Sequence, residues 1–418
     1  MTQAEYDFDV LIIGGGMVGG SLAVALGETE YRIGLVEAFP YGAGQQPAYD
    51  DRSIALAYGS ARIFEAMGLW PDLEPEATPI KKIHVSDRGH LGTTKLDCSE
   101  EHVDALGYVI ESRSVGRVLS ERFPDVSNLE VMAPARLESL EQHADHVQAS
   151  LDCEGEKRTV TARLMVAADG TMSPVRKMLG IEVERHDYQQ AALIANISTE
   201  KAHKFVAYER FTENGPLALL PMSDGRCSLV WTHKTEELAA TEALDDETFL
   251  KKLQERFGYR LGRFTRVGQR ASYPLALMRA KEDFRGRVVL IGNASHTLHP
   301  VAGQGFNLGL RDVAVLADLL FDAAQNKQDP GNRDLLNQYS GWRHEDMERV
   351  SQYTDFLVRV FSNPWGPVAH ARACGLTAAN ILKPVKRTLV RQSMGLQGHL
   401  PRLARGLSLH AYPGREAQ

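Results

Sequence analysis

The sequence predicts an α/β protein in which a domain built on a parallel sheet is interleaved with a second domain built on an antiparallel sheet. Three observations support this fold. A strand–helix–strand pattern occupies residues 8–37, short strand-like segments run from 191 to 232, and a buried strand at 288–291 precedes a glycine-rich turn. We therefore expect the parallel-sheet domain to resume after the antiparallel segment.

The first strand–helix–strand pattern lies near the N-terminus. Residues 8–13 form a nearly continuous apolar run that ends in glycines, as is typical of a buried parallel strand. A helical stretch is expected at about 17–27, and a second apolar segment, 31–36, ends at Glu37. Together these segments have the length of one β-α-β unit, ~30 residues.

The middle of the chain has a different pattern. Its apolar runs are short and are separated by turn residues, which predicts antiparallel strands. The expected strands are 191–198, 205–211, 216–221 and 227–232. A buried strand at 288–291 follows, and then a long helical pattern at 307–320.

Composition excludes several classes of protein. The 418 residues carry a formal net charge of −7 without a basic cluster early in the chain, so we expect no nucleic-acid partner. Four widely separated cysteines form no C-x-x-C pair and fit a reducing compartment. The N-terminus lacks a signal-peptide pattern, and no apolar run approaches the roughly 18 residues of a spanning helix. We expect a cytoplasmic protein that at most lies against the inner membrane.

The last segment, 381–418, is basic. It holds seven Lys and Arg residues against the single acid Glu416, a net charge of +6, with leucines between the basic residues. Two interpretations remain open. The segment either makes a peripheral contact with anionic lipid or packs as helices over the parallel-sheet domain.

A glycine motif follows the first strand. Gly14, Gly16 and Gly19 match G-x-G-x-x-G, which permits a tight turn, close approach of the backbone to a pyrophosphate, and close helix–strand packing. The helix that begins here would direct free N–H groups at the phosphates. Glu37, at the end of the next strand, is placed to accept the ribose hydroxyls. The motif predicts a dinucleotide site, and it does not distinguish FAD from NAD.

Two later motifs decide between these cofactors. Residues 166–170 read V-A-A-D-G and are followed by Ser173 and Arg176, and residues 289–294 read V-L-I-G-N-A and lead into H-P-V-A-G-Q-G-F-N at 299–307. In this order the three motifs resemble the aromatic-ring hydroxylases, a family of single-component flavoprotein monooxygenases. The resemblance covers nearly the whole chain and implies FAD as the cofactor, with NAD(P)H as a transient co-substrate, because no second dinucleotide fingerprint is present.

The resemblance also implies roles for individual residues. Arg52 and Arg113 would contact the FAD pyrophosphate or ribityl region, and Asp169 would lie in a segment shared with the reducing nucleotide. Asn293 occupies the position where the family usually has Asp, and its oxygen can still accept a hydrogen bond from the ribityl chain. The implied cofactor-binding residues are Gly14, Gly16, Gly19, Glu37, Arg52, Arg113, Asp169, Gly292, Asn293, Gly305, Phe306 and Asn307.

The glycine-rich turn before residue 307 would surround the flavin ring. Its glycines allow the backbone to pass close to the ring, and the helix beginning near Asn307 points its positive end there. The expected flavin-ring environment is Pro300, Gly303, Gln304 and Gly305, and no acid–base dyad is assigned. We expect no metal site, because no carboxylate cluster accompanies His296 and His299.

The implied domains are three. The discontinuous FAD-binding domain comprises 1–80, 106–183 and 281–345, the substrate-binding β-sheet domain comprises 81–105 and 184–280, and a C-terminal helical region with the basic tail comprises 346–418.

Several stretches, 83–89, 207–212, 215–221 and 303–312, are similar to the hydroxylases of ubiquinone biosynthesis, in particular to those that act on 2-polyprenyl-6-methoxyphenols. This resemblance implies hydroxylation of a polyprenylated phenol with NAD(P)H and O2 through a flavin hydroperoxide. The lipophilic phenol would reach the enzyme from the membrane or from other ubiquinone-biosynthesis proteins. The expected substrate wall is Phe211, Leu217, Leu219, Leu220, Pro221, Trp231 and Val301, and the alternative for each of these residues is ordinary inter-domain core.

Three other functions remain as alternatives. The chain could hydroxylate a small soluble aromatic acid, which would require a basic residue near the ring. It could instead be a low-turnover flavoprotein subunit of a biosynthetic complex. A dehydrogenase without flavin would explain residues 14–37 and leave the other two motifs unexplained.

Overall fold

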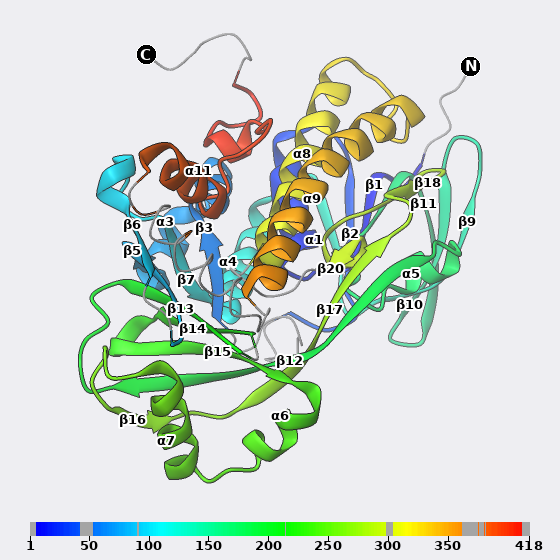
Figure 1. Cartoon of the computed structure of the whole chain (residues 1–418). Helices are drawn as coiled ribbons and strands as arrows, with labels where there is room; N and C mark the ends of the chain where they lie inside the picture. Colours follow the sequence, from blue (N-terminus) through cyan, green and yellow to red (C-terminus); the bar gives the residue numbers. More distant parts are fainter. Residues whose placement is uncertain are drawn as a thin grey trace.

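The computed structural model describes residues 6–41, 53–89, 92–213, 215–297, 304–361, 375, 380 and 382–411, with the backbone alone at 304 and 351–361. Figure 1 shows two layers, with the first sheet and its helices above and a second large sheet below. No helix in these ranges is both long and apolar enough to cross a bilayer.

The first sheet has a parallel centre. Its strands there are β19 (Val288–Leu290), β11 (Glu156–Ala167), β1 (Phe8–Ile13), β2 (Ile33–Val36) and β8 (Leu129–Met132), in this order. Three strands add antiparallel pairs: β18 (Phe284–Arg285) on β19, β10 (Val147–Cys153) on β11, and β9 (Arg136–Gln142) on β10. The side chains of β1 alternate between two cores, since Val10 and Ile12 pack on one face and Leu11 and Ile13 on the other.

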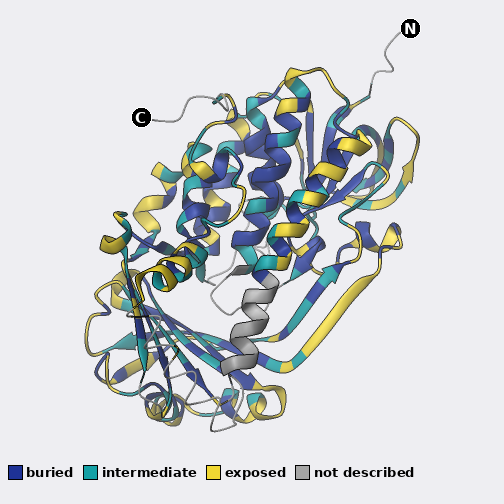
Figure 2. Ribbon diagram, turned by 45° about the horizontal axis from the view of Figure 1, so that its top comes forward, coloured by how far each residue is buried: buried dark blue, intermediate teal, exposed yellow. Residues whose placement is uncertain are grey.

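Helices cover this sheet. They are α1 (Met17–Ala25), α2 (Tyr58–Ala66), α3 (Trp70–Leu73), α4 (Ser112–Arg122), α5 (Pro174–Met178), α8 (Gln304–Gln325) and α9 (Arg333–Phe361). Helix α8 buries Leu310, Val313 and Leu316 in the same core as α1 and β1, and Figure 2 shows this central part largely buried. A small antiparallel sheet of β3 (Ser53–Ala57), β7 (Gly107–Glu111) and β4 (Thr78–Ile80) lies beside it.

The second sheet contains nine strands among the described residues. Its order is β20 (His296–Thr297), β17 (Ala271–Ala280), β12 (Val183–Thr199), β15 (Arg226–Lys234), β14 (Gly215–Pro221), β13 (Val206–Thr212), β5 (Lys82–Asp87) and β6 (Thr93–Asp97), with β16 (Phe264–Val267) on β12. The pairing is antiparallel except between β13 and β5, which run parallel. Helices α6 (Thr235–Glu242) and α7 (Asp246–Phe257) follow β15, and α7 contributes Phe249 and Leu253 to the core of this sheet.

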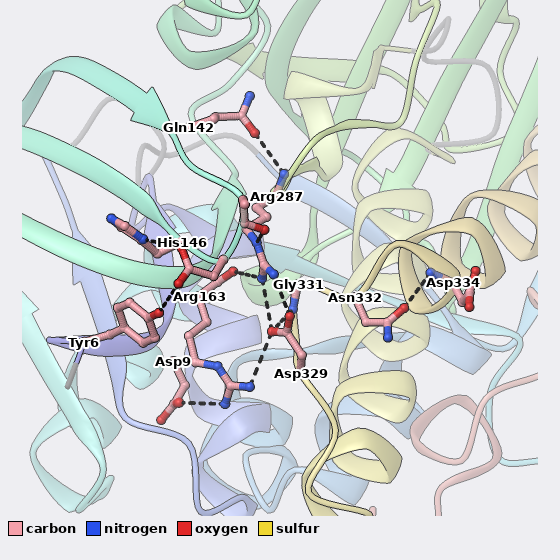
Figure 3. A network of polar contacts seen from close by, with 12 residues as sticks. Tyr6, Asp9, Gln142, His146, Arg163, Arg287, Asp329, Gly331, Asn332 and Asp334 are labelled. Atoms are coloured by element: carbon pink, nitrogen blue, oxygen red, sulfur yellow. Dashed lines mark hydrogen bonds and ion pairs between the residues drawn. The ribbon is translucent and has the colours of Figure 1, made fainter. Parts of the chain in front are cut away.

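A network of polar contacts closes the edge of the first sheet (Figure 3). Arg287 donates to the Asp329 carboxylate at 2.6 Å and to the Arg163 carbonyl at 3.0 Å, and its backbone N–H donates to Gln142 Oε1 at 2.9 Å. Arg163 also pairs with Asp9 at 3.4 Å. The network therefore ties β1, β11 and the β18–β19 turn to the loop that begins α9.

The C-terminal segment packs on the N-terminal third of the chain and on α8. Helix α11 (Lys383–Ser393) buries Val390 against Leu96 of β6, and Figure 1 shows it beside β6. Further on, Arg402 donates to Asp322 at 2.6 Å and lies close to Asp318 of α8. Part of the basic tail therefore packs on the protein itself, as one of the two interpretations expects.

The predicted fold class is confirmed. The first β-α-β unit has its strands at Phe8–Ile13 and Ile33–Val36, and each of the four expected antiparallel segments lies in a strand of the second sheet, except that Phe205 precedes β13. The helix expected at 307–320 is longer and begins at Gln304. Strand β20 was not expected, and it adds residues 296–297 to the second sheet.

Candidate active site

The turn after β1 forms a cradle that excludes side chains. Gly14 has φ +103°, and a Cβ atom built on it would lie 2.5 Å from the Ala168 carbonyl oxygen. A Cβ atom on Gly19 would lie 1.9 Å from the Gly14 carbonyl oxygen. Both distances are impossible contacts, so the turn and the close packing of α1 require glycine at these positions.

The cradle opens on the N-terminus of α1. No side chain among the described residues caps this helix at Gly16, so its first N–H groups face the space in front of the turn. Glu37, buried at the end of β2, accepts hydrogen bonds from the backbone N–H groups of Gly15 at 2.7 Å and of Phe39 at 3.0 Å. Burial raises the pKa of Glu37 despite these two hydrogen bonds. An N-terminus that lacks a cap in this setting is suited to bind a phosphate.

The D-G segment lies next to the cradle. Asp169 Oδ2 accepts a hydrogen bond from the Val175 N–H at 3.0 Å, whereas the buried Oδ1 has no partner among the described residues. Burial raises the pKa of this carboxyl group. Arg176 donates to the carbonyl oxygens of Thr171 at 2.8 Å and Ala294 at 2.6 Å, which joins this segment to the G-N turn.

The G-N turn is held from behind by a buried carboxylate. Asp312 Oδ2 of α8 accepts from the Gly292 N–H at 2.7 Å and contacts His296 Nε2 at 2.8 Å, and its Oδ1 accepts from Arg343. Although burial opposes ionisation, Arg343 and His296 keep the pKa of Asp312 below its ordinary value. His296 therefore has a structural partner, and the side chain of Asn293 is left exposed at the cavity.

The first turn of α8 is hydrogen-bonded to β3 of the small three-stranded sheet. Asn307 Oδ1 accepts a hydrogen bond from the Ala57 N–H, and its Nδ2 donates to the Ala55 carbonyl, both at 2.8 Å. Phe306 stacks on Phe64, with ring centroids 6.3 Å apart. These contacts hold β3 and the start of α8 together beside the space in front of the cradle.

A cavity of about 620 Å³ extends from the cradle to the second sheet. Its cradle end contains residues of the three motifs, namely Gly16, Ala168, Gly170, Gly292, Asn293, Gly305, Phe306 and Asn307. Its other end is apolar and is lined by residues such as Ile83, Val85, Leu96, Leu106, Ile194 and Leu389. This size and this mixture of surfaces are typical of a site for a small molecule.

The two faces of the second sheet correct the expected substrate wall. Phe211 and Leu220 line the cavity, together with Ala218 and Val230, which we did not predict. By contrast, Leu217, Leu219 and Trp231 lie on the opposite face, in the core shared with α7. Pro221 is buried and shares the register of that opposite face. Because side chains alternate along a strand, residues adjacent in β14 point to different environments.

Other predicted residues lie elsewhere. Arg113, in the first turn of α4, pairs with Glu111, and its side chain is 59% exposed and does not line the cavity. Arg52, Pro300, Val301 and Gly303 lie outside the described residues, as does the side chain of Gln304. The cradle residues Gly14, Gly16 and Gly19 lie together with Asp169, Gly292 and Asn293 at the point where β1 and β19 end.

Sequence reasoning also missed Glu209 and two residues of the C-terminal tail that line the cavity. Glu209 of β13 lines it, although the alternation that places Phe211 there also predicts this residue on the same face. Leu389 and Ser393 of α11 line it as well. No local signal in the tail predicts that contact, because it depends on packing against a strand about 300 residues earlier in the chain.

These features fit an FAD cofactor. The cradle leaves room only for backbone, α1 has free N–H groups for a pyrophosphate, and an orphaned buried oxygen of Asp169 needs a donor. The fold, together with the cradle and the two later motifs, is that of the FAD-dependent aromatic hydroxylases, which are monooxygenases.

Comparison with known proteins identifies the family. The profile of the FAD binding domain family matches residues 7–354. The chain is 40% identical over 410 residues to the ubiquinone hydroxylase UbiL of Rhodospirillum rubrum, covering 97% of this chain and 95% of that protein. It is 30% identical to the ubiquinone hydroxylase UbiM of Neisseria meningitidis, covering 93% and 84%. The chain therefore belongs to the FAD binding domain family and, within it, to the group that contains the ubiquinone hydroxylases.

Solved structures share the fold. A p-nitrophenol 4-monooxygenase, PnpA of Pseudomonas putida, superposes with a TM-score of 0.78 at 20% identity, covering 94% of this chain and 98% of that one. PqsL of Pseudomonas aeruginosa, described as a probable FAD-dependent monooxygenase, superposes with a TM-score of 0.72 at 25% identity, covering 88% and 99%.

Proposed function

We propose that this protein hydroxylates the ring of a polyprenylated phenol of the 2-polyprenyl-6-methoxyphenol type in ubiquinone biosynthesis, with NAD(P)H and O2 as co-substrates. The observation that carries the proposal is the apolar end of the cavity. It continues from the cradle along β5, β6 and β14 to α11, with side chains such as Val85, Leu96 and Leu220. A polyprenyl chain is stabilised by such a surface, since each buried CH2 group contributes ~0.8 kcal/mol.

In this proposal the three motifs hold the cofactor. The N-terminus of α1 at Gly16 would bind the pyrophosphate, Glu37 the adenosine ribose, and Asn293 the ribityl chain. When bound, FAD would supply the transfer of electrons from NAD(P)H to O2, which is the source of the oxygen atom added to the ring. The protein would orient the phenol against the cofactor and exclude water, which keeps oxygen transfer coupled to the phenol.

The cavity disfavours a small aromatic acid as substrate. A carboxylate buried near the ring requires a cationic partner. Among the described residues that line the cavity, none is Lys, Arg or His, and the one charged side chain is the acid Glu209. Arg210, the neighbouring cation, donates to the Phe257 carbonyl at 2.6 Å on the opposite side of β13.

The first experiment is extraction of lipids from a cell that lacks this protein, followed by mass spectrometry of quinones and precursors. We expect loss of ubiquinone and accumulation of a prenylated methoxyphenol, restored by the wild-type gene and not by Gly14→Ala. Unchanged precursors, together with no oxygen incorporation from isotopically labelled O2 by the purified holoenzyme, would refute the substrate assignment.

We also propose that α11 meets the membrane surface. Leu382 and Val385 are 52% and 44% exposed, and Lys383 and Arg387 lie on the same short helix whose Leu389 lines the cavity. Exposed apolar side chains beside basic ones are typical of an interfacial helix. A prenylated substrate could then pass from lipid into the cavity beside α11.

Cosedimentation with vesicles tests this contact. We expect the protein to bind vesicles that contain anionic phospholipid more strongly than neutral vesicles, and Leu382→Ser with Val385→Ser to weaken binding. The matched control is Tyr259→Ser, which removes an exposed apolar side chain from the other layer. Equal binding of all three proteins to anionic vesicles would contradict a role for α11.

A further inference from the structure

Glu209 is a carboxylate that points into an apolar cavity. It lies on β13 between Ala207 and Phe211, two residues of the same face, and all three line the cavity. Its neighbours in the register are Ala218 on β14 and Val85 on β5, which also line the cavity. The sheet therefore presents Glu209 to the space that continues to Asn293 and Phe306 at the cradle end.

The surroundings of Glu209 leave its carboxylate without a protein partner. No described residue forms an ion pair or hydrogen bond with it, and it is the one charged side chain among the described residues of the cavity wall. On the other face of the flanking strand β5, His84 contacts Arg260, whereas the buried Asp87 is in register with Phe211 on the face of Glu209. Tyr208 of β13 packs on Phe257 and also borders the cavity. Burial alone raises the pKa of Glu209 to about 7.

An unpaired, half-buried carboxylate in an apolar wall is costly, and such groups are frequent at functional sites. A structural role would require a hydrogen-bond or ion-pair partner that offsets the free-energy cost of desolvating the carboxylate, and none is present in the described part of the chain. A base that gains and loses a proton near neutral pH fits the observation.

We infer that Glu209 is a catalytic residue that accepts the hydroxyl proton of the phenol substrate. This inference rests on the proposed function. Within the cavity, a phenol O–H could donate to a Glu209 oxygen while the ring faces the cradle end. Removal of the proton increases electron density on the ring carbons ortho and para to the oxygen, which are the carbons that attack an electrophilic oxygen atom.

Atoms, protons and electrons balance in this step. The Glu209 carboxylate takes the O–H proton as a ring carbon forms its bond to one oxygen atom of O2 and the O–O bond breaks. The transferred oxygen becomes the new hydroxyl group with a proton from the solvent, and the phenol oxygen becomes a carbonyl. The proton on the attacked carbon then leaves to water, the ring becomes aromatic again, and Glu209 returns its proton to the original oxygen. The ring loses two electrons, and NAD(P)H supplies the two that reduce the second oxygen atom to water.

The test compares Glu209→Gln with wild type as purified holoenzymes acting on a short-chain prenylated methoxyphenol. We expect wild-type kcat/KM to fall as the pH decreases through about 7, and the variant to lose this dependence and to be slower by about 100-fold or more. We also expect the variant to retain FAD and to keep oxidising NAD(P)H, with hydrogen peroxide released in place of product. Glu154→Gln, which changes an exposed turn between β10 and β11, should behave as wild type.

The outcomes separate the two proposals. A variant with wild-type kcat and an unchanged pH profile would overturn the role of Glu209, as would a variant whose defect lies in KM alone. If wild type converts no prenylated phenol and oxidises NAD(P)H without being stimulated by one, the proposed function fails first. Measurement of FAD content and melting temperature distinguishes loss of chemistry from loss of folding.

Discussion

At the residue scale, Glu209 shows how a functional group can oppose stability. Its carboxylate occupies an apolar wall without a described partner, and burial raises its pKa to about 7, compared with about 4.3 for an ordinary glutamate. The folded protein therefore binds this proton more tightly than the unfolded chain does. Stability decreases as the pH rises between these two values, and the full cost applies above pH ~7.

Glu209→Gln should consequently stabilise the protein at alkaline pH. The amide removes the negative charge from the apolar wall, so we expect a higher melting temperature than that of wild type at pH 8 and a nearly equal one at pH 4.5. Thermal unfolding followed by circular dichroism at both pH values measures this difference. An equal difference at both pH values would mean that the carboxylate titrates normally in the folded state.

At the scale of elements, adjacent residues of β14 have different roles, one in the core and one in the cavity wall. Leu219 packs in the core with α7, whereas Leu220 faces the cavity. The sequence predicts the strand and its alternation, but it does not indicate which face meets the cavity. One face of the strand packs on α7 and the other lines the cavity, so both faces carry apolar side chains. The same ambiguity explains why Trp231 and Leu217 were expected in the substrate wall.

Two alanine variants should distinguish the core residue of β14 from the cavity residue. Leu219→Ala should destabilise the fold by about 2–5 kcal/mol, because it leaves a void in a fully buried core, with little effect on KM. Leu220→Ala should raise KM for a prenylated phenol with a smaller loss of stability. Urea unfolding and steady-state kinetics of both variants test this, and the reverse pattern would contradict the assignment of faces.

The helix pair α8–α9 supports the G-N turn through charge. Asp312 and Arg343 are both almost fully buried, and Asp312 also accepts a hydrogen bond from the Gly292 N–H. Asp312→Asn removes a negative charge that compensates the buried positive charge of Arg343. The substitution should therefore lower the free energy of unfolding by about 3 kcal/mol. Glu348→Gln, which breaks an exposed pair with His344 on the same helix, should cost at most about 1 kcal/mol. Equal melting temperatures for the two variants would show that the buried pair contributes no more than the exposed one.

At the scale of the whole molecule, the cavity is enclosed by segments that are far apart in the sequence. The cradle could be predicted, because Gly14, Gly16 and Gly19 follow a strand and begin a helix within 30 residues. The fold class followed from the change between parallel and antiparallel patterns along the chain. The contact of α11 with β6 could not be predicted, since the position of a C-terminal helix is decided by tertiary packing.

Because β3, β13 and α8 all line one cavity, FAD should stabilise the whole molecule and not the cradle alone. Addition of FAD at 100 times its Kd should contribute about 2.7 kcal/mol to the free energy of unfolding. We expect a single unfolding transition that moves to higher temperature as the FAD concentration rises. Gly14→Ala, whose Cβ would meet the Ala168 carbonyl, should show no such rise, whereas Gly341→Ala, with open space around it, should respond like wild type. Two transitions of which only one responds would contradict this coupling.

The alternation of faces in the second sheet has a consequence for laboratory evolution. Ala218, Leu220 and Val230 can be randomised together as one specificity library, while Leu217, Leu219 and Trp231 are kept fixed as the scaffold. The two sets interleave along the same strands, yet mutations in the first set leave the packing against α7 untouched. Such a library would change which aromatic compounds the enzyme accepts, and most of its members would still fold.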